Sequence, residues 1–201
     1  MLDHSRPWTA AEYLALGETM SRVDLIQGAL WAGPAGAGPH QAIVLPLIGA
    51  IQSAATDAGL RTYYGVNVSL RADTIVGPDL VVTSDKRNVE VTDGSEVVLL
   101  GEITSHGTVL VDRVLRKHLY AEAGIDWYLL VEPDLTAYQS VTVRLFRRKG
   151  SRYVQHAVAM HGQTLTSDVP FPFSVSTRGP ARLVTHFAGW KLSKTSWRSS
   201  R

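Results

Sequence analysis

The chain has 201 residues, of which 45% are hydrophobic, and it contains no cysteine, so disulfides, thiolate nucleophiles and thiolate metal sites are excluded. This length suits one domain with a sizeable core, and no apolar run approaches the ~20 residues needed to span a bilayer. The first residues, MLDHSRPWTA, lack the apolar core of a secretion signal. We therefore expect a cytoplasmic protein with no membrane partner.

The net charge of +2 is unevenly distributed along the chain. From Arg178 to the end there are six of the 20 basic residues and none of the 18 acidic ones, which leaves 14 basic and 18 acidic residues, a balance of −4, elsewhere. A basic tail can bind nucleic acid without sequence preference, but a solvated, frayed terminus is the commoner case. We expect one domain over residues 1–176 and a peripheral basic tail over 177–201.

The N-terminal third predicts a short helix, a hairpin and a long helix. The segment TAAE, residues 9–12, has the spacing of a capping box and should begin a short helix. Residues 22–32, RVDLIQGALWA, predict two strands around a Gln-Gly turn. A longer helix is expected over about residues 40–58, where Pro46 is expected to kink it.

The middle of the chain predicts a parallel crossover. Strands are expected over residues 62–70, 79–83 and 96–103, a helix over 110–124, and a largely apolar strand over 126–132. A strand, a helix and a second buried strand imply a right-handed parallel connection.

The last part of the domain predicts antiparallel pairing. Residues 140–146 and 152–159 flank a basic turn and should form a hairpin, and residues 168–175 should follow as an edge segment.

Two acidic residues stand where bare carboxylates would be costly. Asp79 opens the apolar run DLVV, and Glu102 lies near the end of the apolar run VVLLGEI. If the two strands are neighbours, the acids share one end of the sheet, and their repulsion favours a shared proton or a divalent cation. All-oxygen ligands suit Mg²⁺ or Mn²⁺. The alternative is that each acid simply faces water at the end of its strand.

These residues resemble the PD-(D/E)XK nuclease superfamily and, within it, the Uma-two family of proposed restriction endonucleases. The resemblance covers about residues 8–175 and rests on VDLIQGALW, His40 after a Gly/Pro loop, PDLVV, GEITS and VDRVLRKHLYAEAGIDWYLLVEP. It implies an α/β fold with an αβββαβ core, in which a mixed central sheet is flanked by helices. The C-terminal antiparallel hairpin would be an addition to that core.

The resemblance also implies roles for individual residues. Asp79 and Glu102 would bind Mg²⁺ or Mn²⁺, and Asp24 stands where the family usually has a glutamate that completes the metal site. The usual superfamily lysine is replaced by Thr104, whereas Lys117 matches the lysine that this family takes from the following helix. Lys117 would stabilise the transition state or orient the attacking water. On a helical wheel it lies roughly 160–200° from Leu115, away from the core stripe, so it faces either a cleft or solvent.

Three further side chains are auxiliary candidates, and Thr104 is one of them. Tyr120 follows Lys117 by one helical turn, so its hydroxyl can orient a phosphate or a water, although a ring packed under the helix fits the pattern equally well. His40 can line the site from the start of its helix, or lie on the surface.

The resulting hypothesis is a metal-dependent endonuclease that hydrolyses DNA and, by resemblance, forms a homodimer. One alternative is a catalytically silent homodimeric nucleic-acid-binding or regulatory protein on the same fold, which the acidic balance of the domain favours. Another is a structural interaction protein that uses the hairpin edge as its contact surface.

Overall fold

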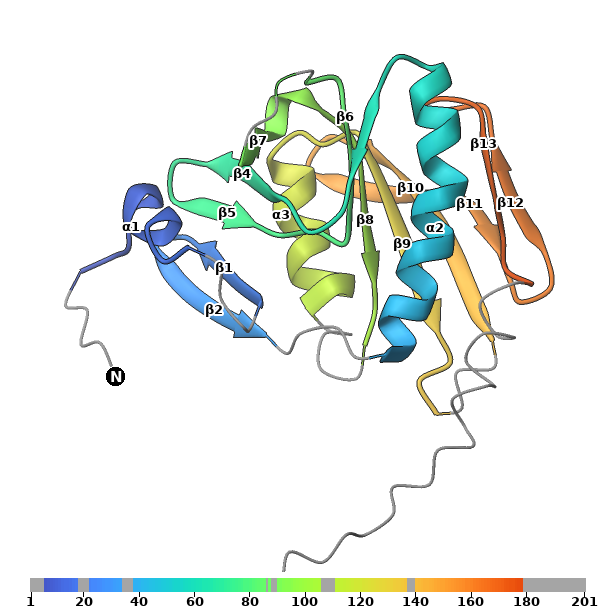
Figure 1. Cartoon of the computed structure of the whole chain (residues 1–201), viewed down its shortest axis with the longest axis horizontal. Coiled ribbons are helices and arrows are strands. Elements are labelled where there is room, and N and C mark those ends of the chain that lie inside the picture. The colour runs from blue at the N-terminus through green and yellow to red at the C-terminus, as the bar shows by residue number, and fades with distance from the viewer. Residues whose placement is uncertain are drawn as a thin grey trace, which may run out of the picture.

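A computed structural model of the chain describes residues 6–17, 22–33, 38–85, 87, 90–105, 111–136 and 140–178. Most of the predicted basic tail, residues 179–201, lies outside this part. The described residues form a mixed α/β structure with three β-sheets, as expected for the α/β class (Figure 1).

The largest sheet has six strands in the order β11-β10-β9-β8-β6-β3. Strands β8 and β9 pair in parallel and all other neighbours pair antiparallel, so the sheet is mixed. The predicted crossover and the predicted hairpin of β10 and β11 are both confirmed. The strands are β3 (Arg61–Tyr63), β6 (Leu80–Thr83), β8 (Val97–Ile103), β9 (Trp127–Pro133), β10 (Val141–Lys149) and β11 (Arg152–Ala159).

A second sheet has five strands in the order β2-β1-β5-β4-β7 and carries the predicted N-terminal hairpin. Gln27 and Gly28 form its turn with φ values of 51° and 77°. Among the described residues, the last two strands form a separate two-stranded sheet. The strands of these smaller sheets are β1 (Arg22–Ile26), β2 (Ala29–Gly33), β4 (Asn67–Arg71), β5 (Thr74–Val76), β7 (Val91–Asp93), β12 (Thr164–Ser167) and β13 (Phe173–Ser176).

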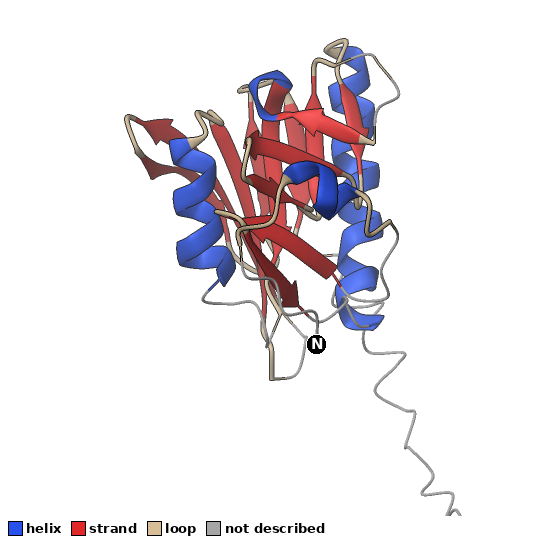
Figure 2. Ribbon diagram, turned by 90° about the vertical axis from the view of Figure 1, so that its left-hand side faces the viewer, coloured by secondary structure: helices blue, strands red, loops and turns tan. Residues whose placement is uncertain are grey.

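Helices cover both faces of the six-stranded sheet (Figure 2). Helix α2 (Gly38–Asp57) packs its buried residues, such as Leu47 and Ile51, against Leu99 on one face. Helix α3 (Lys117–Glu122) packs Leu119 against Leu100 on the other face. Since Leu99 and Leu100 are consecutive in β8, the alternation of a strand directs them to opposite faces, which explains why this stretch of β8 is a continuous apolar run.

Shorter helical segments complete the structure. The predicted capping box is present at α1 (Ala10–Leu14), where Thr9 and Glu12 exchange side-chain and backbone hydrogen bonds. A 3₁₀ turn covers Gly94–Glu96, and a π-helical segment, Val111–Arg116, leads into α3. Among the helices that the structure describes, none has the length and apolarity to cross a bilayer.

Several sequence predictions were wrong in detail. The single strand expected over 62–70 is two strands, β3 and β4, which belong to different sheets because the chain turns at Gly65 with φ of 67°. The three-residue strands β5 and β7 were not predicted, and the expected single central sheet is accompanied by the five-stranded sheet. The helix expected over 110–124 begins as a π-helix, whose i→i+5 bonding changes the faces on which its residues lie.

Candidate active site: a buried carboxylate cluster

Asp79 and Glu102 face each other across neighbouring strands. In the antiparallel pair of β6 and β8, Leu80 lies opposite Gly101, so Asp79 and Glu102 form the next facing pair. Alternation along the strands turns both side chains toward the face that α3 covers. Both residues are buried, and Glu102 has no exposed surface. The Ile103 backbone N–H donates to Asp79 Oδ2 at 2.8 Å and so fixes that carboxylate.

A third buried carboxylate, Asp24, reaches the same place from the five-stranded sheet. Its Oδ1 accepts a hydrogen bond from the Gly77 backbone N–H at 2.9 Å. Gly77 and Pro78 connect β5 to β6, so the chain passes from one sheet to the other immediately before Asp79. We call Asp24, Asp79 and Glu102 the carboxylate cluster.

Arg116 bridges two members of the cluster. Its Nη2 donates to Asp24 Oδ2, and its Nη1 donates to Glu102 Oε1 at 2.6 Å. Only 4% of its side chain is exposed, so Arg116 forms two buried ion pairs. Its guanidinium compensates the charge of both carboxylates. Tyr120, four residues later on the same side of the helix, donates its hydroxyl to Glu102 Oε1 at 2.5 Å. Burial and then the charge of Glu102 raise the pKa of Tyr120 well above its usual value, so the hydroxyl stays protonated.

Arg22 and His40 contact the cluster on its other side. Arg22 Nη1 lies 3.3 Å from Asp79 Oδ1, and Nη2 lies 3.2 Å from Glu102 Oε2. His40, in the first turn of α2, places Nε2 3.3 Å from Asp79 Oδ1. Burial raises the pKa of Asp79, but the hydrogen bond with His40 and the charge of Arg22 outweigh it, and the pKa is lowered overall. Asp79 is therefore held as a carboxylate.

The residues at this site fit a divalent cation in part. Within the described residues, no group of three or more histidine, aspartate or glutamate side chains is arranged to hold a metal ion. Asp79 Oδ1 and Glu102 Oε2 nevertheless both contact the guanidinium of Arg22, each through a different nitrogen, so the two acids face one cationic group. Mg²⁺ is commonly bound through one or two carboxylates while it keeps several waters. The two acids meet that requirement.

Among the residues predicted for the site, the structure does not bring Lys117 to the carboxylate cluster. Its ammonium lies 3.5 Å from the centre of the Phe146 ring, and the neighbouring charges are Glu132 and Arg144. Burial lowers the pKa of Lys117. The family pattern favoured Lys117, whereas in the structure the preceding residue, Arg116, contacts the acids.

The other predicted residues lie at or beside the cluster. Asp79, Glu102, Asp24, His40 and Tyr120 are brought together by the contacts above. Thr104, where the superfamily lysine was expected, is buried just after β8, and its backbone N–H donates to Val131 O at 2.9 Å.

Sequence reasoning missed the two arginines, although signals for both were present. Arg22 precedes Asp24 by two residues in one strand, so both side chains lie on one face. Arg116 precedes Tyr120 by four residues and Lys117 precedes it by three. A spacing of four is closer to the roughly 3.6 residues of one helical turn, so Arg116 shares a face with Tyr120 more closely. Three acids in buried surroundings require cations, and these spacings point to the arginines.

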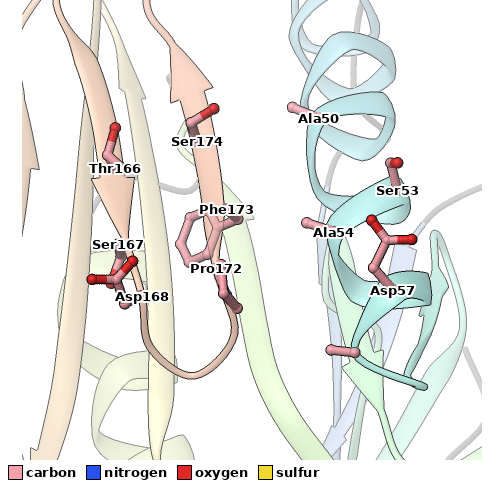
Figure 3. Close-up of a pocket in the computed structure, with 11 residues that line it drawn as sticks. Ala50, Ser53, Ala54, Asp57, Thr166, Ser167, Asp168, Pro172, Phe173 and Ser174 are labelled. Atoms are coloured by element: carbon pink, nitrogen blue, oxygen red, sulfur yellow. The ribbon is translucent and has the colours of Figure 1, made fainter.

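A separate hollow of about 560 Å³ lies between the second half of α2 and the strands β12 and β13 (Figure 3). Ala50, Ser53 and Ala54 line one side, and Thr166 and Ser174 line the other. At 1.5 Å per residue, Ala50 lies roughly 15 Å along the helix from His40. This hollow is therefore not part of the carboxylate cluster.

The mixed α/β fold, with its six-stranded sheet covered by helices on both faces, is also known from a solved structure. That structure, from Anabaena variabilis ATCC 29413, is described as "a putative nuclease belonging to DUF820". It superposes with a TM-score of 0.61 at 18% sequence identity, covering 89% of this chain and 99% of the other, so the two proteins share their fold. Residues 10–179 match the family Uma2, described as "Putative restriction endonuclease", and the chain belongs to that family. The curated proteins contain no significant match.

Proposed function

We propose that the chain is a Mg²⁺- or Mn²⁺-dependent endonuclease that hydrolyses phosphodiester bonds of DNA on a PD-(D/E)XK-type core. The observation that carries the proposal is that Asp79 Oδ1 and Glu102 Oε2, two buried acids on neighbouring strands, both face one cationic group, the guanidinium of Arg22. Two acids directed at one cation in such surroundings are expected where a metal is used, because each would otherwise be costly to bury. The family description and the shared fold agree with this chemistry.

In this proposal Asp79 and Glu102 hold the ion, and Asp24 orients Arg116, which supports Glu102. When bound, the ion would polarise a phosphoryl oxygen and lower the pKa of a water that attacks phosphorus. Arg116 and Tyr120 fix the orientation of the Glu102 carboxylate through hydrogen bonds of 2.6 and 2.5 Å. His40 Nε2, beside Asp79, is placed to accept or return a proton.

The superfamily lysine has no counterpart at the cluster in the part of the chain that the structure describes. The cations there are Arg22 and Arg116, so we assign charge stabilisation to an arginine and give Lys117 a packing role against Phe146. We retain the cytoplasmic location and the homodimer as part of the proposal.

Metal binding and DNA cleavage together test the proposal. Mn²⁺ would be titrated calorimetrically into the wild-type protein, Asp79→Asn and Glu102→Gln, and cleavage of supercoiled plasmid would be followed with Mg²⁺ or Mn²⁺. Both variants should lose metal binding and cleavage. Glu132→Gln is the matched control, because Glu132 also pairs with arginines but lies outside the cluster; it should retain both. Absence of metal-dependent cleavage in the wild type, or full cleavage by Asp79→Asn, would contradict the proposal.

One observation favours a catalytically silent nucleic-acid-binding protein as the second candidate. Each oxygen of Asp79 and Glu102 already lies beside a donor supplied by the protein, so the pair is neutralised without an ion. In that case Asp79→Asn should leave DNA binding, measured by fluorescence anisotropy, unchanged, and Mn²⁺ should have no effect on it.

A further inference from the structure

Arg22 is held at the cluster less firmly than Arg116. Its contacts with Asp79 and Glu102 are 3.2 to 3.5 Å long, whereas charge-assisted hydrogen bonds are usually about 2.7–2.9 Å. Its Nε is buried and has no hydrogen-bond partner among the described residues. Arg22 therefore gives up few good hydrogen bonds when it leaves.

Solvent exposure also indicates that Arg22 is held less firmly than Arg116. The Arg22 side chain is 22% exposed and that of Arg116 only 4%. Arg116 is also fixed at both ends, by Asp24 and by Glu102. Arg22 is thus the cation of the cluster that can turn toward a ligand outside, while Arg116 remains in place.

Arg22 and a divalent cation would require the same oxygens. The guanidinium contacts Asp79 Oδ1 and Glu102 Oε2, which belong to the two acids that would hold the proposed metal ion. Two cations on one pair of carboxylate oxygens would repel each other strongly in a largely buried site. Metal binding and this position of Arg22 therefore exclude each other.

We propose that Arg22 is an internal counter-cation that blocks the metal position until the phosphate backbone of DNA draws its guanidinium away. This inference rests on the proposed metal-dependent function and adds a regulation to it. Guanidinium groups bind phosphate in a bidentate manner, so a phosphodiester placed at the cluster offers Arg22 a better partner than its present long contacts. The metal and DNA then bind cooperatively, and the protein without DNA is a weak metal binder.

Mn²⁺ binding followed by electron paramagnetic resonance of the free ion tests this without a cleavage assay. The wild type, Arg22→Gln and Arg113→Gln would be titrated with and without a duplex containing phosphorothioate linkages, and the duplex with Asp79→Asn would correct for Mn²⁺ bound by DNA. Arg113→Gln removes the same charge from a residue that pairs with Glu132 outside the cluster. Arg22→Lys, which keeps a charge but cannot span both acids, is a second variant if Arg22→Gln folds poorly.

Without DNA, Arg22→Gln should bind Mn²⁺ about tenfold more tightly than the wild type, a coupling of ordinary size, and Arg113→Gln should match the wild type. DNA should tighten Mn²⁺ binding by the wild type but not by Arg22→Gln, and Arg22→Lys should bind with intermediate affinity. If the wild type binds Mn²⁺ and Arg22→Gln binds it no more tightly, this inference fails and the proposed function survives. If neither protein binds Mn²⁺ under any condition, the metal-dependent function fails and the inference fails with it.

Discussion

Replacing two neighbouring residues, Arg116 and Lys117, by methionine should have very different effects on stability. Arg116 holds Asp24 and Glu102, and removal of one partner from a buried ion pair costs about 3–5 kcal/mol because the remaining charges are left uncompensated. Lys117 contacts the Phe146 ring, and a cation–π contact at a partly exposed site contributes about 0.5–1 kcal/mol. Methionine at 117 would still cover that ring. We expect Arg116→Met to lower the free energy of unfolding by about 3 kcal/mol more than Lys117→Met does.

Urea unfolding followed by circular dichroism measures both values, with the wild type as reference. Small domains have total stabilities of about 5–15 kcal/mol, so Arg116→Met can leave little folded protein. Arg116→Lys retains the charge, so its free energy of unfolding should lie between those of Arg116→Met and Lys117→Met. It can be measured even if Arg116→Met is mostly unfolded. An equal loss for both methionine variants, or a larger loss for Lys117→Met, would show that Lys117 rather than Arg116 supports the carboxylates.

Two further predictions concern the packing at two glycines and the pKa of Glu12. A Cβ at Gly101 would lie 3.0 Å from the side chain of Leu80, so Gly101→Ala should cost about 1–3 kcal/mol in a thermal or urea melt. Gly49→Ala in α2, where nothing lies within 4 Å, should instead stabilise by up to about 1 kcal/mol, and equal effects would contradict the packing argument. The hydrogen bond from Arg6, followed by that from the Thr9 backbone, lowers the pKa of Glu12 from 4.5 to about 2. The stabilisation of α1 by Glu12 should therefore be complete above pH 4.5 and lost as the pH falls through about 2. An NMR titration of Glu12 should show this pKa. If the pKa of Glu12 is the same in Arg6→Ala as in the wild type, the prediction is wrong.

The parts of the fold that follow from local patterns were predictable from the sequence. The capping box at Thr9, the Gln27-Gly28 turn and the hairpin of β10 and β11 each depend on residues close together in the chain. The parallel crossover followed from two apolar strands separated by a helix, because only that connection suits them. The pairing of Asp79 with Glu102 could be anticipated on the condition that their strands are neighbours, and β6 and β8 are neighbours.

The remaining features depend on long-range contacts or on small changes in backbone geometry. A turn at Gly65 sends β3 and β4 into different sheets, and no local pattern of hydrophobicity distinguishes this from one continuous strand. Arg116 lies four residues before Tyr120, and both contact Glu102, whereas the family pattern favoured the next residue, Lys117. The basic side chain at the cluster was therefore assigned one residue too far along the chain.

The short connection between β5 and β6 has a mechanical consequence. Gly77 donates to Asp24 from the five-stranded sheet, and two residues later Asp79 contacts Arg22 across the boundary with the six-stranded sheet. The polar groups of the cluster thus connect the two sheets. A movement of one sheet relative to the other would break these hydrogen bonds and ion pairs. A ligand that contacts residues of both sheets would stabilise their association. At a ligand concentration about 100 times its dissociation constant, it would raise the free energy of unfolding by roughly 2.7 kcal/mol. The force needed to separate the two sheets should therefore increase when a ligand occupies the site.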